Sequence, residues 1–71
     1  MTNEEFLQAT GWDEYDAQEA MSYAAFKIID AAEVLSSRNG ERDEESWLVE
    51  VRLKDGQFGA LRAGCDYTGW D

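Results

Sequence analysis

Histidine is absent from the 71-residue sequence, and cysteine occurs once, as Cys65. A single thiol cannot form a disulfide within the chain, which argues against a disulfide-stabilised secreted mini-protein and suits a reducing compartment. The usual zinc and iron–sulfur sites need several histidine or cysteine ligands. We therefore expect neither a metal nor a cofactor.

The sequence also has no long apolar run. Residues 1–10 lack the basic and apolar regions of a secretory signal, and no apolar run approaches the ~20 residues that span a membrane. These features predict a cytoplasmic protein that does not contact membranes.

Recognisable catalytic motifs are missing. The sequence contains no Gly-rich phosphate loop, no GxSxG motif and no histidine that would activate Cys65 as a nucleophile. Carboxylates are the remaining acid–base candidates, but a catalytic pair needs a cleft that a chain of this size rarely builds. We therefore expect that the protein is not an enzyme.

Positive charge is scarce. Sixteen acids oppose six Lys and Arg residues, which gives a formal net charge of −10, and residues 1–26 contain six of the acids and none of the bases. Such a field repels nucleic acid and anionic membranes and attracts basic protein surfaces. We expect no direct binding to nucleic acid.

The apolar content is sufficient for a fold. The sequence is 44% hydrophobic and 13% aromatic, which is more than a disordered acidic tail carries. A chain of this length buries only about 60% of the surface that its unfolded form exposes. We expect one domain with a thin core.

The N-terminal part has the signals of two helices. Thr2 or Asn3 can cap the first helix, and Gly11 can end it. Asp13 can cap a second helix, in which small and apolar residues recur at spacings of three and four. This predicted buried stripe comprises Ala17, Ala20, Met21, Ala24 and Ile28.

The C-terminal part has the signals of a β-meander. Residues 46–54 alternate, with Trp47, Val49, Val51 and Leu53 on one face. Asp55-Gly56 predicts a hairpin, for which a two-residue turn and a bulged turn both remain open. Residues 32–38 can extend the second helix or form a strand, and we favour a strand because two strands alone make a poor sheet.

The predicted fold class is therefore α+β, with N-terminal helices packed on a small three-stranded antiparallel meander. The expected elements are helices at about 3–10 and 13–29, strands at about 32–38, 46–54 and 57–63, and an irregular tail at 64–71.

The second predicted helix combines acids with aromatic side chains. Tyr15, Glu19 and Tyr23 recur at i, i+4 and i+8, and Trp12 and Phe26 can lie alongside as further anchors. Helical carboxylates three or four residues apart are ~5–6 Å from each other, comparable with phosphates along a nucleic-acid strand of ~3.4 Å rise. The candidate partner-binding residues are Asp13, Glu14, Tyr15, Asp16, Glu19 and Tyr23, with the loop acids Asp43, Glu44 and Glu45 as a second patch.

Two resemblances follow from these features. The small size, strong acidity and lack of catalytic motifs are similar to the anti-CRISPR and anti-restriction proteins of phages and mobile elements. Separately, residues 47–71, WLVEVRLKDGQFGALRAGCDYTGWD, resemble a family of small uncharacterised phage and bacterial proteins in which a hairpin leads into the CDYTGWD motif. The first resemblance implies an inhibitor that binds a bacterial surveillance complex and blocks its positively charged DNA-binding surface. A type I complex is the leading candidate. Some such inhibitors block nuclease recruitment instead.

Our hypothesis is thus an anti-CRISPR-like protein, monomeric in the cytoplasm of a bacterial host. It would bind the basic, nucleic-acid-binding surface of a CRISPR surveillance complex or a restriction subunit by nucleic-acid mimicry. The alternative is a small structural or adaptor domain whose acidity serves only solubility.

Overall fold

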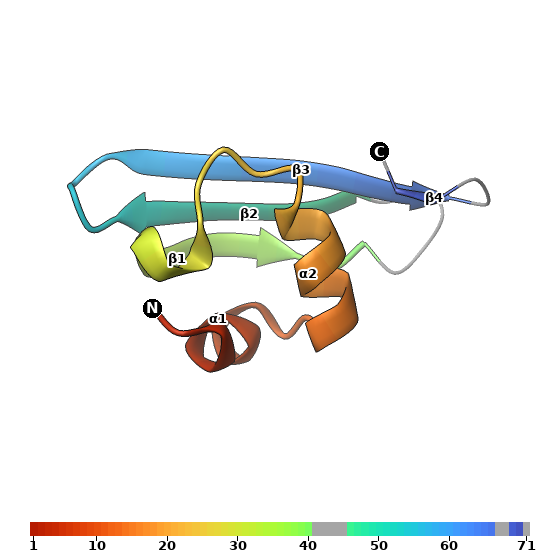
Figure 1. Cartoon of the computed structure of the whole chain (residues 1–71), viewed down its shortest axis with the longest axis horizontal. Coiled ribbons are helices and arrows are strands. Elements are labelled where there is room, and N and C mark those ends of the chain that lie inside the picture. The colour runs from red at the N-terminus through yellow and green to blue at the C-terminus, as the bar shows by residue number, and fades with distance from the viewer. Residues whose placement is uncertain (41–45, 67–68, 71) are drawn as a thin grey trace.

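The computed structural model describes residues 1–40, 46–66 and 69–70, with the side chains of residues 1–40 and 46–64. The helical elements lie together on one face of an antiparallel sheet with the strand order β1-β2-β3-β4 (Figure 1). The predicted α+β class and its three-stranded meander are therefore confirmed. In chain order the elements are α1 (Asn3–Thr10), α2 (Glu14–Met21), the 3₁₀ turn η1 (Ile28–Asp30), β1 (Ala31–Arg38), β2 (Ser46–Leu53), β3 (Phe58–Asp66) and β4 (Gly69–Trp70).

Helix α1 begins and ends as its sequence predicts. The hydroxyl of Thr2 accepts a hydrogen bond from the Glu5 backbone N–H (3.1 Å), and the Thr2 N–H donates to Glu5 Oε1 (2.8 Å). These two bonds form a capping box, which satisfies amides that a helix N-terminus leaves without partners. Gly11 ends the helix in the left-handed conformation, with φ of 75°. The helix buries Phe6 against the sheet.

Helix α2 begins where predicted and ends earlier. Asp13 caps it, because Asp13 Oδ1 accepts from the Asp16 N–H at 2.8 Å. Ala17 and Ala20 are buried, as their spacing predicts, and let α2 lie close to β3.

The predicted extension of the second helix to residue 29 is wrong, since α2 ends at Met21. The reason is Phe26, which would lie on the solvent side of a continued helix. The chain leaves the helix after Met21, and the Phe26 ring packs against Gly59 of β3 instead. Burying a Phe side chain contributes about 1.5–3 kcal/mol, more than helix propensity contributes over one turn.

The β2–β3 connection follows the bulged alternative. The Leu53 N–H donates to the Gln57 carbonyl (2.7 Å), which leaves residues 54–56 as a three-residue loop, and Gly56 has φ of 89°. A three-residue hairpin of this kind needs a residue in the left-handed region, and glycine adopts it without steric cost.

The prediction of an irregular tail at residues 64–71 is wrong in part. Strand β3 continues to Asp66, and β4 pairs with it through Cys65 opposite Trp70 and Asp66 opposite Gly69. Backbone pairing satisfies N–H and C=O groups whatever the side chains are, so the Gly- and Asp-rich composition misled the prediction.

The core lies between the helices and the inner face of the sheet. The inward positions of β2 are those that alternation predicts, with Trp47, Val49 and Val51 buried. Phe6 and Trp12 meet edge to face, with ring centroids 5.6 Å apart. The buried apolar side chains are Phe6, Trp12, Ala17, Ala20, Phe26, Ala31, Trp47, Val49, Val51, Leu61 and Ala63.

Candidate partner-binding surface

The acids that the sequence singled out do not all share one side of α2. The buried Ala17 and Ala20 define the side that faces the sheet. Successive residues of a helix are separated by about 100°. This places Tyr15 and Glu19 on the side away from the sheet, whereas Glu14 and Asp16 lie on opposite flanks. The structure therefore distributes the predicted acidic stripe around the helix.

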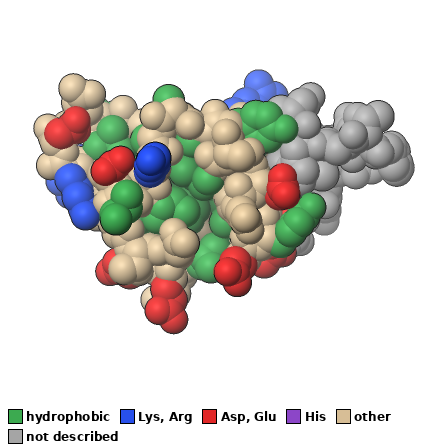
Figure 2. Space-filling view, viewed as in Figure 1, with side chains coloured by type: hydrophobic (Ala, Val, Ile, Leu, Met, Phe, Trp, Pro, Cys, Tyr) green, Lys and Arg blue, Asp and Glu red, His purple; other side chains and the backbone are tan. Residues whose placement is uncertain are grey.

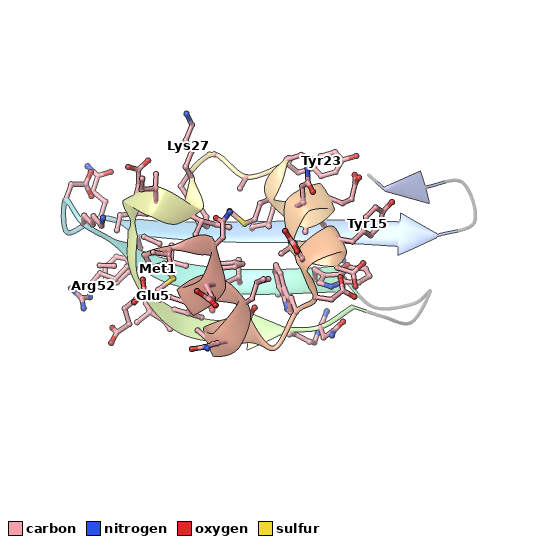
Figure 3. The ribbon with its side chains drawn as sticks, turned by 60° about the horizontal axis from the view of Figure 1, so that its bottom comes forward. Met1, Glu5, Tyr15, Tyr23, Lys27 and Arg52 are labelled. Carbon is pink, nitrogen blue, oxygen red and sulfur yellow. The ribbon has the colours of Figure 1, made fainter. Side chains whose placement is uncertain are left out.

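Two of the predicted aromatic anchors are exposed. Tyr15 is 64% exposed on α2, and Tyr23, just beyond the helix, is 50% exposed. Both project outward from the α2 end of the molecule (Figure 3). The predicted i, i+4, i+8 stack does not form, because α2 ends before Tyr23.

The other two aromatic candidates are not surface anchors. Trp12 and Phe26 are buried in the core. Their predicted role at the interface is therefore wrong. The loop acids Asp43, Glu44 and Glu45 lie outside the described residues.

Acidic side chains nevertheless dominate the helical layer, by which we mean residues 1–30 with α1, α2 and η1. This layer contains seven acids and one base, Lys27. Figure 2 shows acidic side chains over the helices, around a central apolar patch. The acids are Glu4, Glu5, Asp13, Glu14, Asp16, Glu19 and Asp30.

The fold changes the titration of Glu5. The hydrogen bond from the Thr2 backbone N–H, followed by that from the Thr2 hydroxyl, lowers the pKa of Glu5 from its ordinary value of 4.5. Both bonds favour the ionised carboxylate. Glu5 therefore stays charged to a lower pH than an unbonded glutamate.

The opposite face of the sheet, which we call the open sheet face, has a different character. Its described charged residues are two acids and three arginines. Arg52 pairs with Glu33 (3.3 Å), and the Ser36 hydroxyl donates to Glu50 (2.8 Å). Three rows cross β1, β2 and β3, namely Arg38–Leu48–Arg62, Ser36–Glu50–Ala60 and Glu33–Arg52–Phe58.

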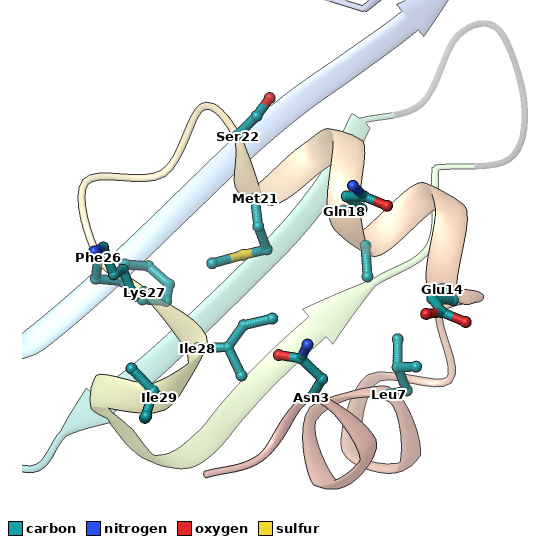
Figure 4. Close-up of a pocket in the computed structure, with 11 residues that line it drawn as sticks. Asn3, Leu7, Glu14, Gln18, Met21, Ser22, Phe26, Lys27, Ile28 and Ile29 are labelled. Carbon is teal, nitrogen blue, oxygen red and sulfur yellow. The ribbon is translucent and has the colours of Figure 1, made fainter.

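A groove in the helical layer was not expected from the sequence. It has a volume of about 620 Å³ and lies between α1, α2 and the connection from α2 to η1 (Figure 4). Its apolar lining consists of Leu7, Ala17, Met21, Phe26, Ile28 and Ile29. Its polar rim consists of Asn3, Glu14, Gln18, Ser22 and Lys27. Glu14, Gln18 and Met21 are spaced at i, i+4 and i+7, which places them on one side of a helix. This spacing alone does not show that a groove lies beside them, because the groove also depends on where α2 ends.

The described residues bring together no group of three or more His, Cys, Asp or Glu side chains that could hold a metal ion. None of the helices in the described ranges is both long enough and apolar enough to cross a membrane. Comparison of the chain with protein-family models, curated proteins and solved structures finds no match.

Proposed function

We propose that the helical layer binds a basic, nucleic-acid-binding surface of a bacterial defence complex and blocks its access to DNA. The target class is a CRISPR surveillance complex or a restriction subunit, as in the anti-CRISPR and anti-restriction proteins that this sequence resembles. The protein acts as a binding inhibitor in this proposal, without a catalytic step of its own.

The observation that carries the proposal is the segregation of charge between the two faces. On the helical side seven acids face Lys27, the N-terminal ammonium and Lys54, which lies near Glu5. The described residues of the open sheet face have three arginines against Glu33 and Glu50. If the acids served only solubility, the helical layer and the open sheet face would not need to carry net charges of opposite sign. Complementary potentials orient a partner and speed its capture.

Exposed tyrosines on the helical layer also support the proposal that it binds a partner. Tyr15 lies on α2 and Tyr23 lies just beyond its end, and each combines a large apolar ring with a polar hydroxyl. Aromatic side chains of this kind are enriched among the residues that dominate interface energies. The acids thus provide attraction at long range, and the tyrosines provide close contacts that slow dissociation.

A competition experiment tests the proposal. Purified type I surveillance complex is given labelled target DNA with and without the protein, and DNA binding is measured by fluorescence anisotropy. We expect the native protein to prevent DNA binding, and the Asp16→Lys/Glu19→Lys variant to lose most of this effect while keeping its thermal unfolding transition. The same assay with a restriction enzyme tests the second target class.

The proposal fails if the native protein leaves DNA binding unchanged in both systems. Binding to the complex without DNA competition would place the effect at nuclease recruitment instead of DNA mimicry. Binding that the acid reversals do not weaken would favour the adaptor alternative.

A further inference from the structure

The groove between α1 and α2 is an open depression in the helical layer. Its volume of about 620 Å³ lies within the range of about 300–1,000 Å³ that ligand-binding sites occupy. Ala17 and Phe26 are buried at its floor, and Leu7, Met21 and Ile28 are half-buried along its walls. Figure 4 shows Leu7, Met21 and Ile28 projecting into the space between the two helices and η1. An apolar side chain entering this groove would contact apolar atoms on several sides.

The rim of the groove offers unused hydrogen-bonding groups. The side-chain amides of Asn3 and Gln18 make no hydrogen bond to another described residue, and both line the groove from opposite helices. Each amide has a donor and an acceptor, so each can bind the backbone of an extended or helical segment. These groups suit a peptide better than a purely apolar ligand.

The ends of the groove differ in charge. Glu14 lies at the α2 end and Lys27 at the opposite end (Figure 4). The acids of the helical layer as a whole outnumber its bases, so the field of this layer favours a positively charged occupant. A second copy of this chain carries a net charge of −10 and would be repelled. Charge complementarity therefore selects a basic segment over another copy.

We propose that this groove binds an apolar side chain from a basic segment of the partner, with a Lys or Arg of that segment next to Glu14. This inference rests on the proposed function, since the basic surface of the partner supplies the segment. In this proposal the apolar contact with the partner is made inside the groove. The sequence had predicted that exposed side chains of Trp12 and Phe26 would make it. Recognition then combines an apolar pocket with an acidic rim, the arrangement of a typical interface hot spot.

Selection from a random peptide library displayed on mRNA tests the inference without knowledge of the target. We expect the enriched peptides to carry Leu, Ile or Met beside Lys or Arg. The dissociation constant of a selected peptide should rise about tenfold or more in the Met21→Gln and Ile29→Ser variants, because each removes apolar contact in the groove. Ile29 is 65% exposed, so its replacement leaves the core packing intact.

The matched control is Phe58→Ser. Phe58 is also a large exposed apolar residue, at 72%, but it lies on the open sheet face, opposite Arg52. This variant should bind the peptide like the native protein. Glu14→Lys should weaken binding, whereas Lys27→Glu should strengthen it.

The inference is overturned if no peptide is enriched, if the enriched peptides are neutral or acidic, or if Phe58→Ser weakens binding as much as Ile29→Ser. The outcome is separable from that of the proposed function. If the Met21→Gln and Ile29→Ser variants block DNA binding as well as the native protein does, the proposed function stands and the groove has no part in it. If peptides bind the groove and DNA binding is never blocked, the groove stands and the proposed function falls.

Discussion

Gly59 allows the Phe26 ring to lie directly on β3. A Cβ atom at this position would come within 2.7 Å of Phe26 Cδ1 and 3.1 Å of Phe26 Cε1. These distances are too short for carbon atoms in contact, so one of the two residues would have to move. This packing holds the chain between α2 and η1 against the sheet and thereby shapes the floor of the groove.

Replacement of this glycine tests the packing. We expect Gly59→Ala to lower the free energy of unfolding by about 1–3 kcal/mol, the usual cost of overfilling a packed core. Urea denaturation measures the change. In a Phe26→Leu background the same replacement should cost less, because the smaller side chain leaves room for the methyl group. Equal costs in both backgrounds would show that the clash is relieved elsewhere.

The Thr2–Glu5 capping box makes the stability depend on pH. The folded pKa of Glu5 is lowered from 4.5, so the ionised carboxylate stabilises the fold above that value. The contribution disappears as the pH falls through the lowered pKa. Glu5→Ala should therefore be less stable than the native protein at pH 7, and the difference should shrink below pH 4.5. Urea denaturation across this range measures it, and a difference independent of pH would contradict the assignment.

At the scale of the elements, the caps and the alternating strand were predictable because they depend on neighbours in the sequence. Thr2, Gly11 and Asp13 have the roles that their residue types predict, and β2 has the predicted inner face. The end of α2 was not predictable from the same rules. It depends on a contact between Phe26 and Gly59, which are far apart in the chain.

The candidate site was predicted only in part, for the same reason. Residue types make Tyr15 and Tyr23 candidate anchors, and both are exposed, but residue types do not say that Trp12 and Phe26 are buried. The groove needs α1, α2 and η1 to be positioned in space, so no local pattern specifies it.

Asp13 has a structural role in α2 as well as a predicted role in binding. Asp13→Ala removes the cap, and we expect the free energy of unfolding to fall by about 1 kcal/mol. Asp13→Ser keeps a capping oxygen and removes the charge, so its stability should remain close to that of the native protein. Chemical denaturation of the pair separates the cap from the charge. Equal losses in both variants would mean that the charge, not the cap, stabilises α2.

At the scale of the whole molecule, the charges are polarised as well as numerous. The acids of the helical layer outnumber its bases, whereas the described residues of the open sheet face include three arginines and two acids. A partner with an extended basic surface is therefore expected to dock in one orientation, with its positive charge over α2.

This polarity predicts how salt affects binding. Exposed charges are screened over about 10 Å at 0.1 M ionic strength. Raising the salt concentration should slow association with the basic partner, while dissociation, which depends on tyrosine and groove contacts, should change much less. Surface plasmon resonance at several salt concentrations measures both rates. A salt effect confined to dissociation would contradict long-range attraction.

Two variants with the same change in net charge test whether binding depends on the face that carries the acids. Asp16→Lys/Glu19→Lys reverses two acids of the helical layer, and Glu33→Lys/Glu50→Lys reverses two acids of the open sheet face. Each is measured in the DNA-competition assay beside the native protein. We expect the first variant to lose inhibition and the second to keep it. Equal loss in both variants would show that net charge alone acts, and would contradict an acidic recognition surface on the helical layer.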